Sequence, residues 1–245
     1  MLLAVAESNH HHTVIFDRYG RCPAFIEYFH KLFARSQNAL RGRWENLWAA
    51  EEPCVTRLVD CESVVDKLTY AAANPVKDLL VERVHQWPGV HGLANLISGR
   101  PLRARRPLHF FRSSGPMPES AVLTLAIPAE LGESDQIIAE VTQRVRLVED
   151  AMREYRNRTG KRVLGRRRVL EQSWKDAPTS IEPRRALRPR FAGRLAARIT
   201  ALLDYRRFLA AYRRAREIWL RGEPTKFPVG TYWLTTHASA AVDTP

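Results

Sequence analysis

The sequence predicts an α+β fold, in which a small sheet and packed helices precede a basic region that is mainly helical. Two apolar runs near the beginning, residues 2–6 and 13–16, have the length and composition of short strands. Later segments repeat apolar residues at three- and four-residue steps, which is the spacing of an amphipathic helix. A chain of 245 residues is long enough for one large domain or two small ones with a sizeable core.

The first forty residues are expected to contain a strand and a helix. Residues 2–16 form one long strand, or a strand interrupted near Glu7, that ends at the turn of residues 17–20. Pro23 suits the first turn of a helix, whose apolar face continues until Gly42 ends it.

The next segment is expected to hold a short strand pair and a second helix. The strand pair lies within residues 48–59, and the helix starts near Asp60 or Ser63. Pro75 disfavours helical geometry at the residue before it, so the regular helix should end at about Asn74.

The second half of the chain is expected to add two strands and two long helices. The strands are expected at residues 108–112 and 121–127, and the helices at residues 134–155 and about 192–221. Between these helices, residues 161–168 are rich in arginine, and the proline-containing residues 177–189 are expected to form a linker.

The charge of the chain favours a polyanionic partner. Lysine and arginine number 39 against 26 aspartate and glutamate residues, a formal net charge of +13. Basic side chains gain free energy when they displace counterions from phosphates, so the imbalance indicates a nucleic acid. The alternative is an arginine-rich surface without such a partner.

The cysteines and the apolar segments indicate a cytoplasmic protein. Cys22, Cys54 and Cys61 form no CxxC pattern, which suits a reducing cytosol. The apolar N-terminus is too short for a signal peptide, and the longest apolar stretch, residues 121–131, is too short to span a membrane. We therefore expect no membrane partner and a location in a bacterial-type cytoplasm, associated with the nucleoid.

Two histidines could share one metal ion. Side chains two residues apart in a strand point to the same face, so the imidazoles of His10 and His12 can reach one cation. Alternatively, the two are exposed polar residues or the remnant of a tag. An HxH pair by itself does not decide between these interpretations.

A tyrosine and an asparagine form the second pair. Tyr70 and Asn74 are four residues apart in an expected helix, so they lie on one face a single turn apart. Alternatively, Tyr70 is a core aromatic and Asn74 is a polar helix stop before Pro75.

Taken together, the two pairs resemble a known family. Residues 8–12 (Ser-Asn-His-His-His) resemble the NHxH strand of the single-tyrosine HUH transposases, particularly the REP-associated tyrosine transposases. Residues 70–76 (Tyr-Ala-Ala-Ala-Asn-Pro-Val) are similar to the YxxxNPV helix of that family. Residues 42–48 look like its segment with glycine and tryptophan, and Trp87-Pro88 is similar to a pair that follows its nucleophile helix.

The resemblance implies a ferredoxin-like (RRM-like) antiparallel sheet, with the histidine strand at its centre and the tyrosine helix packed beside it. It implies that His10, His12 and Asn74 bind a divalent cation, Mg²⁺ or Mn²⁺, and that Tyr70 attacks a DNA phosphodiester. The family reaction cuts and rejoins single-stranded or hairpin DNA through a 5′-phosphotyrosine link. Because a tyrosine hydroxyl with a pKa of about 10 is a weak nucleophile at neutral pH, a cation on the phosphate suits this chemistry.

The sequence departs from the family pattern near its beginning. His11 replaces a bulky hydrophobic residue and is expected to point to the face opposite His10. Family members carry a strand and a helix before the histidine strand, so residues 1–95 are expected to form a catalytic domain without them. The histidine strand would then lack its usual paired neighbour. Residues 96–160 are expected to be accessory, and residues 161–245 to form a basic C-terminal region.

Other functions are considered beside strand transfer. The main alternative is a non-catalytic DNA-binding remnant of such a transposase, and either protein would be a monomer or a homodimer. A zinc hydrolase is disfavoured because no third ligand has a convincing spacing. Tyr205 and Tyr212 in the last helix are assigned to structure. The arginines expected to contact DNA are Arg166, Arg167, Arg168, Arg206, Arg207, Arg213 and Arg214, although a solvated basic helix would also explain the last four.

Overall fold

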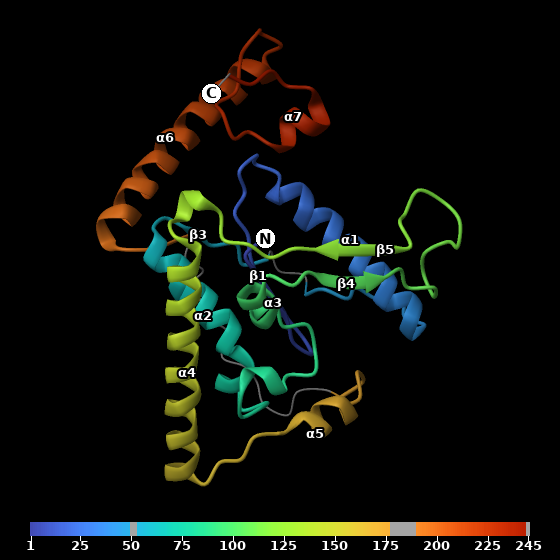
Figure 1. The fold of residues 1–245 in the computed structure, drawn as a ribbon. Coiled ribbons are helices and arrows are strands. Elements are labelled where there is room, and N and C mark those ends of the chain that lie inside the picture. Colours follow the sequence, from blue (N-terminus) through green and yellow to red (C-terminus); the bar gives the residue numbers. More distant parts are fainter. Residues whose placement is uncertain (50–52, 177–189, 244–245) are drawn as a thin grey trace. The chain divides into compact units, whose positions relative to one another are not determined.

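The computed structural model describes residues 1–49, 53–176 and 190–243 (Figure 1). The chain divides into two compact units, each built from segments that are distant in sequence. The division of the chain into a catalytic domain, an accessory part and a basic C-terminal region, with boundaries at residues 95 and 160, stays a prediction. Unit 1 draws its described residues from Met1–Phe16, Arg35–Leu47 and Cys61–Leu187, and unit 2 from Asp17–Ala34, Trp48–Asp60 and Arg188–Pro245.

A hairpin opens unit 1. Strand β1 (Leu3–Ala6) pairs antiparallel with β2 (His11–Val14). The turn between them is closed by the Glu7 amide, which donates to the His10 carbonyl over 2.8 Å. The single long strand is therefore wrong, and the alternative with an interruption near Glu7 is the one observed. The histidine strand has a paired neighbour, β1, so the expectation that it lacks one is also wrong.

Strand β1 has backbone partners on both of its sides. On the side away from β2, the Ala6 amide donates to Val90 and the Gly92 amide donates to Ala4, both over 2.9 Å. The side chains of Leu3 and Val5 are at most 1% exposed, which explains why β1 takes the interior position. Within the described residues the histidine strand β2 is at the edge, so its expected central place is wrong.

Helix α2 (Cys61–Lys77) covers the hairpin and packs along α4 (Ser134–Thr159), as Figure 1 shows. Its apolar side chains are buried, and α4 meets them with a buried stripe at four-residue steps. The expected long helix from residue 134 is confirmed, and Gly160 ends it with a φ of +70°. The buried side chains at the centre of this contact are Val64, Leu68, Ala72, Ile137, Val141 and Val145.

The predicted end of α2 at Asn74 is wrong. The helix contains Pro75 and continues to Lys77. Proline removes one N–H group, and near the end of a helix this loss interrupts few further bonds. The His91 ring lies 2.8 Å from the Ala72 carbonyl and hydrogen-bonds to it from the side. Pro75 itself is fully buried, so packing favours this conformation.

A second hairpin in unit 1 consists of β4 (Leu102–Arg105) and β5 (Ser120–Leu123), which pair antiparallel. The strand expected at residues 108–112 is wrong, because those residues lie in the loop between β4 and β5. The strand expected at residues 121–127 overlaps β5. Unit 1 also contains α3 (Leu93–Ser98), α5 (Arg166–Glu171) and two single 3-10 turns, Val84–Gln86 and Ala129–Leu131.

Helix α1 (Cys22–Arg41) begins in unit 2, where the Asp17 carboxylate caps its start. The amides of Arg21 and Cys22 both donate to this carboxylate over 2.8 Å. Gly42, with a φ of +61°, ends the helix as expected.

Strand β3 (Arg57–Leu58) pairs in parallel with β6 (Phe191–Ala192). The pair expected within residues 48–59 is thus formed with a distant segment instead, and residues 50–52 lie outside the described part of the chain. Helix α6 (Leu195–Leu220) confirms the last expected helix, and α7 (Trp233–Ala238) follows it. A small core in unit 2 gathers the buried side chains of Ala215, Phe227, Leu234 and Ala240.

The protein therefore has a mixed α and β architecture with small, mainly antiparallel sheets. The described strands form three two-stranded pairs, and the ferredoxin-like sheet stays a prediction. Among the described helices, none combines the length and apolar character that crossing a membrane requires. The expected linker at residues 177–189 lies outside the described residues.

Candidate active site

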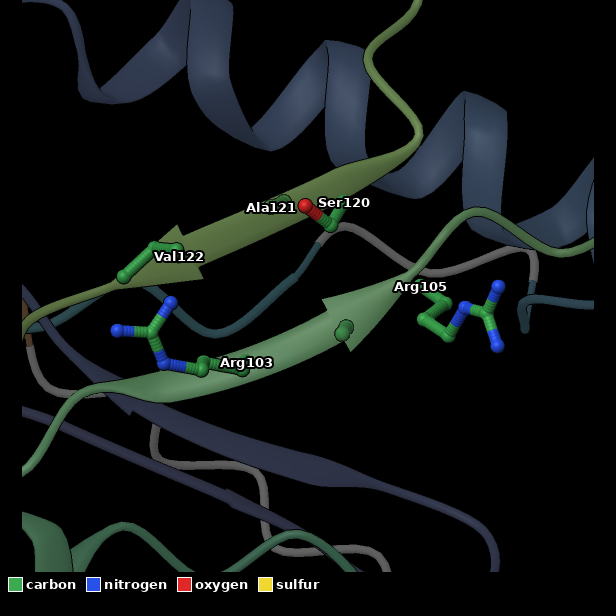
Figure 2. A pocket seen from close by; sticks show the side chains of 6 residues that line it. Arg103, Arg105, Ser120, Ala121 and Val122 are labelled. Atoms are coloured by element: carbon green, nitrogen blue, oxygen red, sulfur yellow. The ribbon is translucent and has the colours of Figure 1, made fainter.

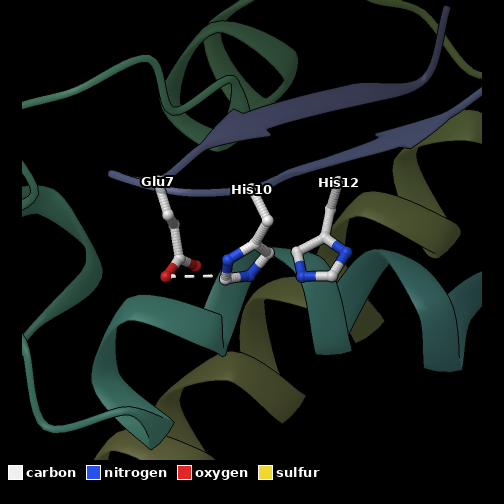
Figure 3. Close-up of side chains that lie close together, drawn as sticks. All are labelled: Glu7, His10 and His12. Atoms are coloured by element: carbon white, nitrogen blue, oxygen red, sulfur yellow. Dashed lines mark ion pairs between the residues drawn. The ribbon is translucent and has the colours of Figure 1, made fainter. Parts of the chain in front are cut away.

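Three side chains of the first hairpin converge on one amide of helix α2. The Asn74 Nδ2 atom lies 2.7 Å from Glu7 Oε1, 3.0 Å from His10 Nε2 and 3.2 Å from His12 Nε2. The ligand atoms of Glu7, His10 and His12 all lie within 4.8 Å of one another (Figure 3). The structure thus brings together His10, His12 and Asn74, as the sequence predicts.

The second ring nitrogen of His10 has a partner of its own. Its Nδ1 atom lies 2.8 Å from the side-chain Oδ1 atom of Asn9 and, in the tautomer that carries its proton on Nδ1, donates to this oxygen. The Nε2 atom then keeps its lone pair and faces the Asn74 amide. Such a hydrogen bond on the far side of the ring is how proteins orient histidine ligands of metals. Asn9 is therefore a positioning residue for His10.

The cluster has more acceptors than donors. An amide NH₂ group carries two protons, and three acceptors surround the Asn74 nitrogen. With a lone pair on both imidazole Nε2 atoms, at least one acceptor is left without a proton, which is unfavourable in a partly buried site. A cation would satisfy all of them, and half a turn of the amide would present its oxygen as a further ligand. The donor set thus fits a divalent cation.

Burial controls the charge of these side chains. It lowers the pKa of His12 to about 4, and the nearby charges of His10, His11 and Lys67 add to this shift. His12 is therefore neutral at pH 7, the form that binds metals. Burial also raises the pKa of the Glu7 carboxyl, against the opposing effects of Asn74 and His10. Only 2% of the Glu7 side chain is exposed, so a cation beside it would compensate a poorly solvated charge.

Tyr70 stands beside the cluster and is open to solvent. Its side chain is 42% exposed, and among the described residues its hydroxyl has no hydrogen-bond partner. Its ring meets the His12 ring edge to face, with the centroids 5.3 Å apart. Tyr70 is therefore not a core aromatic, and Asn74, which lies within the helix, is not merely its stop.

The turn that carries the cluster is held from the other side by Trp87. The indole N–H group of Trp87 donates to the Ala6 carbonyl over 2.9 Å. Its ring packs in a buried cluster with Val76 of α2 and with Val81, which follows the helix. The Trp-Pro pair noted in the sequence therefore fixes the end of β1 relative to the tyrosine helix.

Glu7 is the member of the site that the sequence did not reveal. In one continuous strand, Glu7 and His10 are three residues apart and point to opposite faces. The chain reversal between β1 and β2 brings them to the same face instead. The only sequence feature that could have indicated Glu7 as a ligand was its polar side chain between two apolar strands. That feature places Glu7 beside the histidines only when the chain is known to reverse between Ala6 and His11.

The arginines expected to contact DNA lie on two helices that belong to different units. All are exposed, and none joins the cluster around Asn74. Arg167 pairs with Glu171 over 2.7 Å and Arg207 with Asp204 over 3.1 Å. Helix α5 carries Arg166, Arg167 and Arg168, and α6 carries Arg206, Arg207, Arg213 and Arg214.

A further basic surface lies on the second hairpin of unit 1. Arg103 and Arg105 are two residues apart on β4, where the strand register pairs them with Val122 and Ser120 of β5 (Figure 2). The hollow between these side chains is shallow, and both strands are almost entirely exposed. Nothing in the sequence pattern indicated a role for these two arginines.

Comparison with models of protein families, with curated proteins and with solved structures returned no match. The motif resemblance and the geometry of the cluster therefore carry the functional conclusion. Of these, the geometry is the stronger, because it unites residues from two elements more than sixty positions apart.

Proposed function

We propose that this protein is a DNA strand transferase of the transposase type, which cuts and rejoins single-stranded or hairpin DNA with Tyr70 as nucleophile. One observation carries the proposal: an exposed tyrosine lies one helical turn from an amide on which two imidazoles and a carboxylate converge. General DNA binding requires no such arrangement, since basic side chains alone suffice.

His10, His12, Glu7 and the Asn74 amide oxygen would hold the divalent cation. Hard oxygen ligands suit Mg²⁺, and two imidazoles shift the preference towards Mn²⁺. Such a cation, when bound, would neutralise the scissile phosphate and make its phosphorus more electrophilic. Asn9 would keep the His10 lone pair directed at the site, and Trp87 would keep the turn in place.

The proposed reaction balances without a nucleotide cofactor. The Tyr70 hydroxyl oxygen bonds to phosphorus while the bond from phosphorus to the 3′-oxygen breaks. The phenolic proton is released, and the departing 3′-oxygen takes up a proton, so a 3′-hydroxyl forms. The 5′-phosphotyrosine ester keeps the energy of the broken bond, and attack by a 3′-hydroxyl reverses the step and rejoins a strand.

The finer features of the resemblance belong to the same proposal. We infer that the first hairpin and the segment paired with β1 are part of a ferredoxin-like sheet. The exposed arginines of α5 and α6 would add affinity for DNA without reading sequence, because contacts to phosphates carry no sequence information. A protein with this activity would work in a bacterial-type cytoplasm, on nucleoid DNA.

The test is the formation of a covalent complex between protein and DNA, for which the proposal states which end of the cut strand stays attached to the protein. Hairpin-bearing oligonucleotides with randomised flanks are labelled at either end and incubated with the protein and Mn²⁺. A 5′-phosphotyrosine link leaves the 3′ label on the denatured protein and releases the 5′ label. We expect EDTA and Tyr70→Phe to abolish this product. Sequencing the attached DNA would give the cleavage site.

The matched control is Tyr155→Phe, which removes the hydroxyl of another tyrosine of unit 1, on α4. This variant should form the complex as the original protein does. A complex that persists in Tyr70→Phe would move the nucleophile elsewhere. DNA binding without any covalent complex would instead support the alternative, a non-catalytic DNA-binding remnant.

A further inference from the structure

Two lysines of α2 stand on the same face of the helix as the tyrosine and the asparagine. Lys67, Tyr70, Asn74 and Lys77 follow one another at steps of three, four and three residues, which is the repeat of a single helical stripe. The Lys67 ammonium lies 5.4 Å from the centroid of the Tyr70 ring, and the Lys77 ammonium lies 4.7 Å from it. One lysine precedes the tyrosine along the helix, and the other follows it.

Neither lysine is neutralised within the part of the chain that the structure describes. No carboxylate there lies within ion-pair distance of Lys67 or Lys77. Asp66, the acidic neighbour of Lys67 in sequence, pairs with Arg144 of α4 instead. A tyrosine face attracts a cation weakly at an exposed site, and two like charges at one ring repel each other. An anion between them would remove that repulsion.

We propose that Lys67 and Lys77 form a phosphate-binding pair that holds the DNA backbone on the two sides of the scissile phosphate. The inference rests on the proposed function, because it takes Tyr70 as the point of attack. The ligand class is a polyanion with phosphates in series. Two cations that precede and follow the nucleophile along the helix suit a strand that runs along the helix, with one phosphate beside each lysine.

The geometry gives the pair a definite role. Strand transfer needs the phosphorus in line with the attacking oxygen, and backbone contacts fix the register of DNA on a protein. The cluster of Glu7, His10, His12 and Asn74 meets the tyrosine ring through His12, and a single cation site of this kind would hold one phosphate, the central one. Lys67 and Lys77 supply the contacts on the neighbouring linkages that the cluster lacks.

The experiment measures binding apart from cleavage. Affinity for the hairpin oligonucleotide is followed by fluorescence anisotropy in EDTA, over a series of KCl concentrations, with Tyr70→Phe in every protein. Each phosphate contact to a single strand contributes about 0.7 to the slope of log affinity against log salt. The double variant Lys67→Ala, Lys77→Ala should therefore lower the slope by about 1.4. Lys67→Arg, Lys77→Arg, which keeps both charges, should retain it.

The matched control is Lys161→Ala, Lys175→Ala, which removes the same charge from two lysines that also contact aromatic rings. Lys161 donates to the Tyr155 hydroxyl over 2.7 Å and lies away from the histidines in sequence. An equal drop in the slope of log affinity against log salt for this control would show that only the net charge of the protein matters. It would overturn the proposal that Lys67 and Lys77 bind phosphates as a pair. An unchanged slope for Lys67→Ala, Lys77→Ala would overturn it as well.

Once the cleavage site is known, uncharged linkages in the DNA backbone can show which phosphates Lys67 and Lys77 contact. A methylphosphonate on either side of the scissile linkage should weaken binding of the parent protein several-fold. It should have little effect on Lys67→Ala, Lys77→Ala, whose contacts are already lost. Equal weakening of both proteins would place the contacts elsewhere. The salt-slope results do not depend on a covalent complex, so failure of strand transfer in the protein with Tyr70 would be recognised separately.

Discussion

Helices α2 and α6 both carry tyrosine and basic side chains, but the two helices differ in how much of their surface is buried. Of the seventeen residues of α2, eleven are buried, so packing on most sides fixes the direction of the polar stripe that remains. Of the twenty-six residues of α6, only Ala215 is buried. Chemistry that needs atoms in fixed positions can be supported by α2, whereas the exposed arginines of α6 suit contacts that tolerate movement.

The tyrosines of the two helices show the same difference. Tyr70 meets a histidine of the acceptor cluster and two lysines. Tyr205 stacks on Phe208 and hydrogen-bonds to Arg190 through its hydroxyl. The Tyr212 ring contacts those of Phe208 and Phe227, and Phe227 is a fully buried member of the unit 2 core. A tyrosine becomes a candidate nucleophile through its neighbours, and only Tyr70 has a set of metal-ligand types beside it in the described residues.

The largest expected effect separates these tyrosines by chemistry. Tyr70→Phe should lower the yield of covalent DNA complex at least a hundredfold, because the attacking oxygen is removed, and should leave the melting temperature nearly unchanged. Tyr205→Phe should do the reverse, with full yield and a loss of roughly 0.5–1.5 kcal/mol in unfolding free energy from the lost hydrogen bond. Gel assays and thermal melts of both variants measure the contrast. If Tyr205→Phe also lost the complex, the two helices would share the chemistry.

The second prediction separates the helices by stability. Leu68 of α2 is completely buried, and Leu203 of α6 is 45% exposed. Leu68→Ala should lower the free energy of unfolding by about 2–5 kcal/mol, because it leaves a cavity between α2 and its neighbours. Leu203→Ala should stay within roughly 0.5 kcal/mol of the original protein. Urea unfolding provides both values, and similar losses would mean that α6 is covered in solution.

The sequence predicted the helices better than the sheets, for a physical reason. Helices α1, α4 and α6 show their periodicity locally, and each begins within three residues of the expected position. Strand pairing depends on residues far along the chain. Nothing near Arg57 indicates that its partner is Phe191, and the apolar run at residues 108–112 has no partner strand in the described structure.

The parts of the site whose residues are close in sequence could be predicted. His10 and His12 share a strand face, and Tyr70 and Asn74 share a helix face, so spacing alone groups each pair. Glu7 enters only through the reversal of the chain at the hairpin, and Lys77 only because α2 continues past Pro75. Both were hidden by an element boundary, which is what a single sequence predicts least well.

The third prediction concerns the cation. Glu7→Gln keeps the shape of the side chain and removes its charge, so the affinity for Mn²⁺ should fall by about tenfold or more, equivalent to at least about 1.4 kcal/mol. Glu217→Gln on the exposed surface of α6 is the matched control and should leave the affinity unchanged. Titration calorimetry measures both. An unaltered affinity in Glu7→Gln would remove the carboxylate from the set of ligands and leave the imidazoles and the amide.

The smallest expected effect concerns pH and a histidine outside the cluster. Burial lowers the pKa of His91 from its usual 6.5, although hydrogen bonding to Ala72 and the charge of Glu149 partly oppose the shift. The folded protein therefore keeps His91 neutral at a pH where the unfolded chain has already taken up a proton. Stability from this side chain is complete above pH 6.5 and is lost as the pH falls through the folded pKa, at no more than about 1.4 kcal/mol per pH unit.

His91→Gln keeps a donor for the Ala72 carbonyl and removes the titrating ring. Its unfolding free energy should decline less steeply than that of the original protein between pH 6.5 and 5, as measured by urea unfolding at half-unit steps. His12 titrates in the same direction but is present in both proteins, so the difference isolates His91. Parallel curves for the original protein and His91→Gln would show that folding does not lower the pKa of His91, and therefore that its ring is not kept from water beside α2. The region around the site would then be no more firmly packed than α6, which would break the comparison between the two helices.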